Sequence, residues 1–533
     1  MLGDAELKIE TERIRAKATG KRIIHVDDSG EIFMAYQKFR VNRRNNDHYV
    51  VHFKSNGKVR KKNKIKIKDK RLFLSFFHNG KKLYLLTYFT NSDKQKVYFF
   101  REEIDRETLA VKQESIESIF SFDLPPDNLK ANNLYFDYRT NKAKNARFMV
   151  HMFNGKYDDK RPFSHSVACI DHNFNVVWKT DLLKSDMMED DHYSYTISQF
   201  DDNGNLFLKV LEHPDLGKSK RQLAKSGIEV PDLEGNRKYY ANYVCKLFVF
   251  YSKGEESAYD EHVIELPNGH KTGKYSPVSI SSDDGRFRVV GSYSDFDYKF
   301  TKGFFITEGK IGEELNMNQT QLVEADLDLF LQNDRIRPSI LSSGYHNDIE
   351  MGSCRDEAAD LGYKSIVSHA DGSLTLVAEI YKVFAYSTNS NGVVSTDYYG
   401  ANMNVYFFHI DAEGALSWSR RIPKPNFSRY AQDYGSLIVV TSGNNLNLLY
   451  GYNKDNDIEP SSTQAYGSFF LTKKSKYVNA LLDIKGNASY KKVATVKDLR
   501  GAIRTDYSYR QGNKTYCFIQ DGRRLFVCSI SAG

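Results

Sequence analysis

The chain has 533 residues, 13% of them aromatic, and a formal net charge of +8 at pH 7. So small an excess of positive charge over this length argues against a nucleic-acid-binding protein, whose basic footprint is denser. The 5 cysteines form no CxxC pair and, being odd in number, no disulfide framework. No apolar run approaches the roughly 18 residues that cross a bilayer.

Runs that alternate between apolar and polar residues recur along the chain, separated by turns that contain Gly, Asn or Asp. This pattern is typical of antiparallel strands joined by hairpins, and we divide it into units of four strands, A to D in chain order. Strands A and B of units one to seven are KRIIHVDDSG–EIFMAYQKF, RLFLSFFHNG–KKLYLLTYF, NNLYFDYRTN–ARFMVHMF, YSYTISQFDDNG–NLFLKVLEH, SPVSISSDDG–RFRVVGSYSD, the runs on either side of Asp371-Gly372, and GSLIVVTSGN–NLNLLYGYN.

An eighth unit is incomplete, because IRTDYSYRQGN, KTYCFIQDG and RRLFVCSIS supply only strands A to C. The stretch ELKIETERIRAK, which precedes unit one, has no partner there. We expect Lys8–Arg15 to pair beside Leu525–Ile530 as the outermost strand of the last blade, which would leave no open ring. The sequence therefore predicts an all-β chain, a single β-propeller domain over residues 1–533 with eight four-stranded antiparallel blades. Seven blades is the alternative, if unit three or five is misread.

The phrases DGSLTLVAEIY, DYYGANMNVYFFHIDAEGALSWSRRIPK and LLYGYNKDND resemble exported β-propeller proteins of unknown function from Bacteroidota, most clearly over roughly residues 362–456. The resemblance implies an exported protein of the periplasm or cell surface, associated peripherally with the cell envelope. It offers no catalytic residues. The first residues, MLGDAELKIETERI, lack a basic segment followed by an apolar core, so they predict no signal peptide in the chain as it stands. A cytoplasmic location is the alternative.

Three insertions interrupt the repeat, and we expect loops at residues 213–243, 324–363 and 384–403. The first and third lie between strands B and C, and the second lies between strand D and the next strand A. Both kinds of connection leave the same face of a propeller, and loops on a rigid scaffold commonly carry function. The candidate residues for binding a protein or glycan are Tyr239, Tyr240, Tyr243, Tyr398 and Tyr399. Tyrosine suits this role because it combines a large apolar body with a hydroxyl group. Alternatively, these tyrosines only hold their own loops.

The run Lys58–Arg71 is the densest charge in the chain. It could contact phospholipid headgroups or an acidic polysaccharide. We favour an outermost strand, because lysines on a sheet edge block the addition of further strands. In that strand the isoleucines face one way and the alternating lysines the other: Ile65 and Ile67 against Lys64, Lys66 and Lys68.

Two smaller groups also have a functional and a structural interpretation. Trp178 and Trp418 occupy equivalent places in strand D of units three and six, where we favour packing between blades over a sugar-stacking platform. Asp455, Asp457 and Glu459 place oxygen ligands at alternate positions, as a Ca²⁺ site would. We favour a solvated turn there and predict no metal site.

The sequence contains no GxSxG, HExxH, phosphate-binding loop or GxGxxG motif. We therefore predict no catalytic residues and no cofactor. The chain is interpreted as a non-catalytic binding or scaffold propeller for a protein or glycan. The alternative is a carbohydrate-active propeller enzyme, a glycoside hydrolase or lyase, with carboxylates at the channel mouth. Cys517 and Cys528 lie on neighbouring strands of the last hairpin, and we expect them to remain thiols because directly paired positions rarely offer the torsion of a disulfide.

Overall fold

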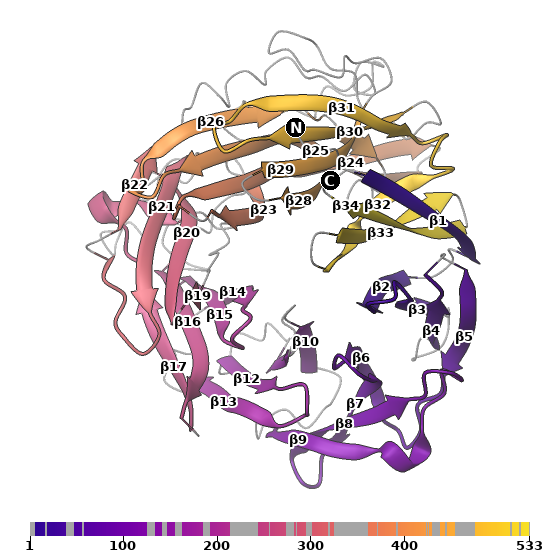
Figure 1. The fold of residues 1–533 in the computed structure, drawn as a ribbon. Coiled ribbons are helices and arrows are strands. Elements are labelled where there is room, and N and C mark those ends of the chain that lie inside the picture. The colour runs from indigo at the N-terminus through magenta and orange to yellow at the C-terminus, as the bar shows by residue number, and fades with distance from the viewer. Residues whose placement is uncertain are drawn as a thin grey trace. The chain divides into compact units, whose positions relative to one another are not determined.

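The computed structural model describes most of the chain in segments. These are residues 6–15, 19–38, 47–55, 58–124, 134–140, 147–154, 163–184, 192–213, 244–254, 256–272, 282–283, 285–294, 301–317, 320–324, 361–369, 371–390, 393–422, 424, 426–428, 437–442, 445–452, 475–511, 514–521 and 524–531. Nearly all regular structure in these segments is β-strand (Figure 1). The 3₁₀ helices η1 (Gln113–Ser115) and η3 (Pro267–Gly269) have 3 residues each. No helix in the described segments combines the length and apolarity needed to cross a membrane.

Contacts divide the chain into two compact units, which we describe separately. The first comprises residues 1–62, 299–304 and 323–533, and the second comprises residues 63–298 and 305–322. The described strands form eight antiparallel sheets, six of four strands and two with a fifth short strand. These sheets are the blades of an eight-bladed β-propeller, as the sequence predicts.

Blades 1, 6, 7 and 8 are assigned mainly to the first unit. Blade 1 contains β2 (Thr19–Val26), β3 (Ile32–Lys38), β4 (Asp47–Phe53) and β5 (Val59–Ile65). Blade 6 contains β23 (Leu361–Ser368), β24 (Leu374–Ser390), β25 (Val393–Ile410), β26 (Leu416–Ile422) and the short β27 (Asn426–Ser428). Blade 7 contains β28 (Ile438–Ser442), β29 (Asn445–Tyr452), β30 (Lys476–Leu482) and β31 (Ala488–Thr495). Blade 8 contains β32 (Ala502–Gln511), β33 (Lys514–Asp521), β34 (Arg524–Ser531) and β1 (Glu6–Arg15).

Blades 2 to 5 are assigned mainly to the second unit. Blade 2 contains β6 (Leu72–His78), β7 (Leu83–Asn91), β8 (Lys96–Ile104) and β9 (Glu117–Asp123). Blade 3 contains β10 (Leu134–Thr140), β11 (Phe148–Asn154), β12 (Phe163–Ile170) and β13 (Val176–Lys184). Blade 4 contains β14 (His192–Phe200), β15 (Leu206–His213), β16 (Val244–Lys253) and β17 (Glu256–Val263). Blade 5 contains β18 (Lys271–Thr272), β19 (Ser282–Asp283), β20 (Arg286–Ser294), β21 (Thr301–Lys310) and β22 (Gln321–Glu324).

The last blade is completed by the first strand, as predicted. β1 pairs antiparallel with β34, so that Glu6 lies opposite Ser531 and Arg15 opposite Arg524 (Figure 1). The register shifts between Glu10 and Ile14, where the ladder has a bulge. The strand order of this sheet is β1-β34-β33-β32, which makes β1 its outermost strand.

A recurrent aspartate turn joins strands A to B and C to D. In five of these turns the first residue accepts, at 2.7–2.9 Å, the backbone N–H of the residue four positions later; these residues are Asp27, Asp171, Asp201, Asp411 and Asp483. In four of the five the fourth residue is a glycine with φ between 80 and 89°, a conformation in which glycine has no steric cost. The Gly-containing turns read from the sequence are therefore side-chain-capped turns with a left-handed residue.

Apolar side chains fill the space between successive sheets within each unit. In the second unit, one buried cluster joins blades 2 and 3, another joins blades 3 and 4, and a third joins blades 4 and 5. In the first unit the equivalent clusters join blades 6 and 7, 7 and 8, and 8 and 1. Trp178 and Trp418 belong to this packing, because Trp178 is 3% exposed and the ring of Trp418 lies against Gly486 of the next blade. Each indole Nε1–H donates to a backbone carbonyl of the next blade, that of Gly204 at 2.8 Å and that of Ile484 at 2.9 Å. The packing interpretation of both tryptophans is confirmed.

β5 is the outermost strand of blade 1, which confirms the structural interpretation of the basic run. Ile65 is 4% exposed and Ile67 is half-buried, whereas Lys64, Lys66 and Lys68 are exposed. The alternation continues beyond the last strand residue, Ile65, as far as Lys68.

Cys517 and Cys528 lie directly opposite each other in β33 and β34, and both are buried free thiols. Their Sγ atoms are 2.8 Å apart, so the paired positions do bring the two sulfurs together. The contact with Cys528 and burial raise the pKa of Cys517 well above its usual value. The raised pKa favours the thiol form of Cys517 over the thiolate, which is the species that is oxidised. That the two cysteines form no disulfide stays a prediction.

Deleting residues 1–18 tests the role of β1. Without β1, β34 becomes an edge strand with unpaired backbone groups, so we expect the melting temperature to fall by several degrees and light scattering to rise on warming. Deletion of residues 1–5 alone, which leaves β1 intact, is the control. A melting temperature equal to that of the intact chain would show that the closure contributes nothing to stability.

Candidate functional site

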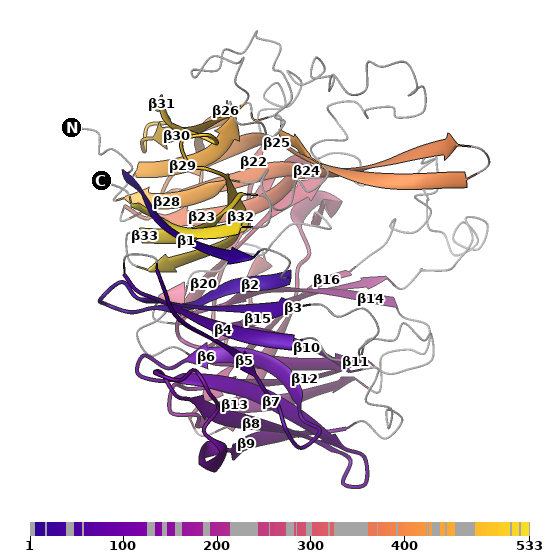
Figure 2. The same ribbon diagram turned by 90° about the vertical axis from the view of Figure 1, so that its right-hand side faces the viewer.

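The most distinctive feature of the described residues is a two-stranded arm that continues from blade 6 (Figure 2). β24 and β25 pair along the blade and then onwards from Tyr381 opposite Asn402 to Ser390 opposite Val393. Their neighbours in the sheet end earlier, because β23 pairs no further than Ile380 and β26 pairs no further than Val405. Residues 384–390 and 393–399 therefore pair, among the described strands, only with each other. The segment 384–403, which the sequence predicts to be a loop, is a β-ribbon.

The root of the arm is braced by three features. A bulge between Glu379 and Tyr381 shifts the register where the ribbon leaves the blade, and bulges commonly redirect strands. The short strand β27 pairs with residues 400–402 of β25. Lys424 forms an ion pair with Glu379, and both side chains are fully buried. Since a buried charge is tolerated only when it is paired, this ion pair fixes the chain after β26 against the base of the arm.

The second and third insertions meet blade 6 at the same place. Leu361, the first residue of β23, pairs with Ile380, immediately before the arm begins. The connection that follows β22 therefore enters blade 6 beside the root of the arm. The strand bounds also place residues 214–243 between strands B and C of blade 4, the kind of connection that the sequence predicts.

Only two of the five candidate tyrosines fall on described residues. Tyr398 and Tyr399 are adjacent in β25, opposite Ala385 and Phe384. Adjacent positions of a strand belong to opposite faces of a ribbon, so a partner on one face would meet only one of the two positions. Residues 214–243, which contain Tyr239, Tyr240 and Tyr243, lie outside the described residues, and so do the weak metal candidates Asp455, Asp457 and Glu459. Among the described residues no cluster of three or more His, Cys, Asp or Glu could hold a metal ion.

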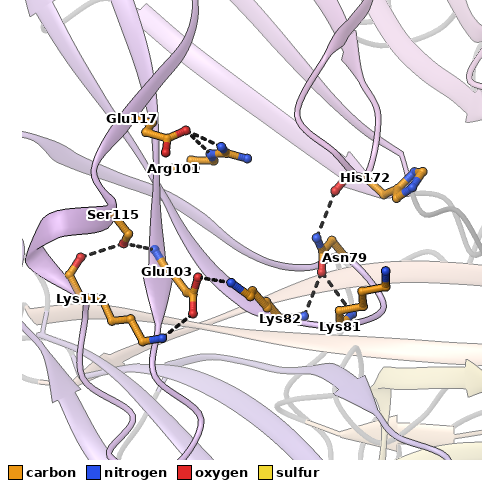
Figure 3. Close-up of polar contacts among 9 residues, drawn as sticks. All are labelled: Asn79, Lys81, Lys82, Arg101, Glu103, Lys112, Ser115, Glu117 and His172. Atoms are coloured by element: carbon orange, nitrogen blue, oxygen red, sulfur yellow. Dashed lines mark hydrogen bonds and ion pairs between the residues drawn. The ribbon is translucent and has the colours of Figure 1, made fainter.

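A polar network in blade 2 ties its turns and outer strands together (Figure 3). The carboxylate of Glu103 accepts from Lys82 at 2.7 Å and from Lys112 at 2.6 Å. The hydrogen bonds from Lys112 and Lys82 lower the pKa of Glu103. Asn79 caps the turn between β6 and β7, and its Nδ2 donates to the backbone carbonyl of His172 in blade 3 at 3.1 Å. The charges at Glu103 are satisfied within the network, so we assign it a structural role.

Blade 2 also contains a buried ion pair. Arg71 Nη1 lies 2.7 Å from Glu102 Oε1, and the hydroxyl of Thr87 donates to the same oxygen at 2.8 Å. Burial raises the pKa of Glu102, whereas the hydrogen bond from Thr87 and the charge of Arg71 lower it, and the net direction is upward. A carboxyl group with a raised pKa is one half of what a glycoside hydrolase needs. The second carboxylate on Arg71 is Asp69, 3.3 Å from Nη2. Because the guanidinium binds both acids, the arrangement is an ion-pair bridge rather than an acid facing an open cleft.

Two histidines share one hydroxyl in blade 6. Thr375 Oγ1 lies 2.7 Å from Nε2 of His369 and 2.9 Å from Nδ1 of His409, and all three residues are buried. Because a hydroxyl has one proton, it can donate to one ring and accept an N–H from the other, so both rings are satisfied while neutral. Burial lowers the pKa of both histidines. His409 stacks on Trp418, with the ring centroids 5.1 Å apart. Nothing in the sequence alone indicates that Thr375 and His409 lie opposite each other in neighbouring strands.

No protein-family model matches this chain, and no curated protein matches it in sequence. The solved structures that it resembles include a prolyl endopeptidase, at 9% identity with a TM-score of 0.33, over 87% of this chain and 45% of the other, so this chain spans less than half of that one. Another is the β-propeller domain of the Trilobed protease from Pyrococcus furiosus, at 10% identity over 96% of each chain with a TM-score of 0.30. A third is an α-L-arabinanase from Penicillium chrysogenum complexed with arabinobiose, at 10% identity over 71% of this chain and 93% of the other with a TM-score of 0.27. Likenesses at this level concern the fold alone.

Replacing Lys424 by Met tests the brace at the arm root. The substitution leaves the carboxylate of Glu379 buried without its cation, which typically costs about 3–5 kcal/mol. We expect the free energy of unfolding in urea to fall by about that amount and the double variant E379Q/K424M to recover most of it. If Lys424→Met changes the free energy of unfolding by less than about 1 kcal/mol, the pair does not support the fold.

Because several histidines are buried, we expect the folded protein to lose stability at acid pH. His151 is the clearest case. Burial, with a smaller effect of Arg139, lowers its pKa from 6.5 to about 3. A depressed pKa means that the unfolded chain binds a proton below pH 6.5 while the folded chain does not. The contribution of neutral His151 to stability is therefore fully present above pH 6.5 and is lost as the pH falls towards 3. For this one group the loss at pH 5 is about 2 kcal/mol.

The measurement is urea unfolding at pH 7.5 and pH 5 for the wild type, His151→Gln and, as a control, the less buried His172→Gln. His151→Gln should reduce the difference between the two pH values, and His172→Gln should not. An undiminished difference in His151→Gln would assign the acid sensitivity to other groups.

Proposed function

We propose that this chain is a non-catalytic binding propeller that recognises a protein through the arm of blade 6 and the insertions that accompany it. The observation that carries the proposal is the arm itself, in which residues 384–390 and 393–399 pair only with each other among the described strands. An isolated two-stranded hairpin is marginally stable in water. The arm therefore contributes little to the stability of blade 6, from which it continues.

A protein partner suits this ribbon better than a glycan does. The outer edges of a two-stranded ribbon offer backbone N–H and C=O groups at regular spacing, and an extended peptide can add to such an edge as a further strand. Side chains at alternate positions then supply specificity. Phe384, Tyr386, Tyr398 and Tyr399 give the ribbon aromatic positions in both of its strands, and aromatic residues are frequent at the centres of binding surfaces.

We also propose that the protein is exported and lies in the cell envelope. The support is the resemblance of residues 362–456 to exported propellers. Fractionation of the source cells distinguishes this location from the cytoplasmic alternative.

The arm is tested with the single variants Tyr398→Ala and Tyr399→Ala, with T388A/S395A near the tip as a control that removes no aromatic ring. Proteins captured from the source organism on each immobilised variant are identified by mass spectrometry, and a glycan array is probed in parallel. Because the two tyrosine positions belong to opposite faces, we expect one of the two variants to weaken capture of a specific protein at least about tenfold. The melting temperature should change little.

Equal capture by all variants would contradict a binding role for the arm. Binding to the glycan array in place of a protein would change the class of partner. Hydrolysis or cleavage of a polysaccharide would favour the carbohydrate-active enzyme. Loss of stability with intact capture would show that the tyrosines only hold the ribbon.

A further inference from the structure

The outermost strand of a blade is a sheet edge, and most of these edges are shaped in ways that block the addition of a further strand. A register shift, which marks a bulge, interrupts the pairing of β1, β9, β13, β26 and β31. β5 contains lysines of the basic run, and β22 has only 4 residues. Bulges, lysines and short length are three features by which proteins keep a sheet edge from pairing with another chain.

β17 (Glu256–Val263), the outermost strand of blade 4, has none of these three features (Figure 1). It pairs with β16 along all 8 of its residues without a register shift. It contains no lysine, arginine or proline. Among the described strands it has no second neighbour. β17 is therefore a regular sheet edge to which a further strand could be added.

The hydrogen-bond pattern shows which residues of β17 direct their backbone groups away from β16. The N–H of Ile264, the residue after β17, donates to the carbonyl of Cys245 at 2.8 Å, so these two residues form a hydrogen-bonded pair. Hydrogen-bonded and non-hydrogen-bonded pairs alternate along an antiparallel ladder. Tyr259 and Val263 therefore present their N–H and C=O groups to the outside of the sheet.

The same two residues have exposed apolar side chains. Tyr259 is 40% exposed and Val263 is 39% exposed, and they are two of the four large hydrophobic side chains that are exposed in the described part of the chain. The ring of Tyr259 rests on Phe250, with the ring centroids 5.8 Å apart. Residues of an added strand would lie opposite both side chains, where cross-strand pairs interact. β17 thus offers backbone pairing and two apolar contacts together.

The charge around β17 favours one kind of occupant. Residues 244–265, which contain β16 and β17, include 5 acids and 2 lysines, a net charge of −3 in a chain of +8. Two copies of β17 that paired antiparallel with Tyr259 opposite Val263 would place Glu261 opposite Glu261. Like charges directly opposite each other are destabilising, whereas a strand that contains Lys or Arg meets opposite charges. The acids therefore disfavour a second copy and favour a basic segment.

We propose that β17 is a docking edge for an extended segment of a partner protein in which apolar residues alternate with Lys or Arg. The segment adds to blade 4 as a further strand by backbone pairing. Its apolar side chains pack on Tyr259 and Val263, and its cations lie near the carboxylates of the hairpin. This edge belongs to blade 4, whereas the function proposed above uses the arm of blade 6.

The test measures binding of a fluorescent peptide of five Val-Lys repeats to the full chain by fluorescence polarisation. The variant Y259K/V263K gives β17 the lysines that protect other edges. Its matched control, L72K/V176K, replaces the other two exposed large hydrophobic side chains and adds the same charge. A peptide of five Gly-Lys repeats has the charge of the probe but a low strand propensity. Melting temperatures verify that both variants are folded.

The wild type and L72K/V176K should bind the Val-Lys peptide, and Y259K/V263K should bind it at least about tenfold more weakly. A second variant, Val263→Pro, removes one outward N–H at a position where an edge strand tolerates proline, and it should also bind more weakly. Absence of binding to the wild type, equal binding by the wild type and Y259K/V263K, or equal binding of the two peptides would overturn the proposal. Self-association of the wild type that is lost in Y259K/V263K, measured by sedimentation, would overturn it in favour of a second copy.

Discussion

Within each unit the structure depends on one constraint: the apolar faces of neighbouring sheets must cover each other. In the second unit, Phe148 of blade 3 illustrates how this is met, because its ring lies 4.8 Å from Phe77 of blade 2 and 5.9 Å from Phe174 in its own blade. Burial of aromatic rings of this size contributes more than any single hydrogen bond to holding successive sheets together. Because the sheets are held together through their faces, the ends of the strands need not be covered by a neighbouring sheet. Insertions, turns and the arm are all found at the ends of strands.

The fold could be predicted because its determinants are local. The alternation of apolar and polar residues gives the strands, and the aspartate and glycine of turns such as Asp201–Asn205 give their ends. The N-terminal closure was also predictable, since ELKIETERIRAK is a strand pattern without a partner and blade 8 lacks a strand. The first strand of blade 5 was less clear. In the structure two short strands, β18 and β19, pair with β20 where the sequence suggests one continuous strand.

The arm and the polar sites could not be read from the sequence, because they depend on which strands become neighbours. Residues 384–403 are rich in Ser, Thr, Asn and Tyr, a composition that resembles a loop, yet their pairing is fixed in register by the blade from which they continue. Glu379 and Lys424 lie in different parts of the chain and meet only once β24, β25 and β26 have formed. The same is true of His369 and His409.

The pairing of β1 with β34 has a consequence for synthesis in the cell. A ribosome makes β1 before the other strands, and roughly 500 further residues must be added before β34 emerges, which at 5–20 residues per second takes roughly half a minute to two minutes. During this time the other blades can form in order from their own hairpins, while β1 waits as an unpaired strand. Contacts so distant in sequence form slowly because a very long loop must close. β1 therefore stays without its partner strand during synthesis, and a chaperone that shields this extended segment would act in the interval before β34 is made.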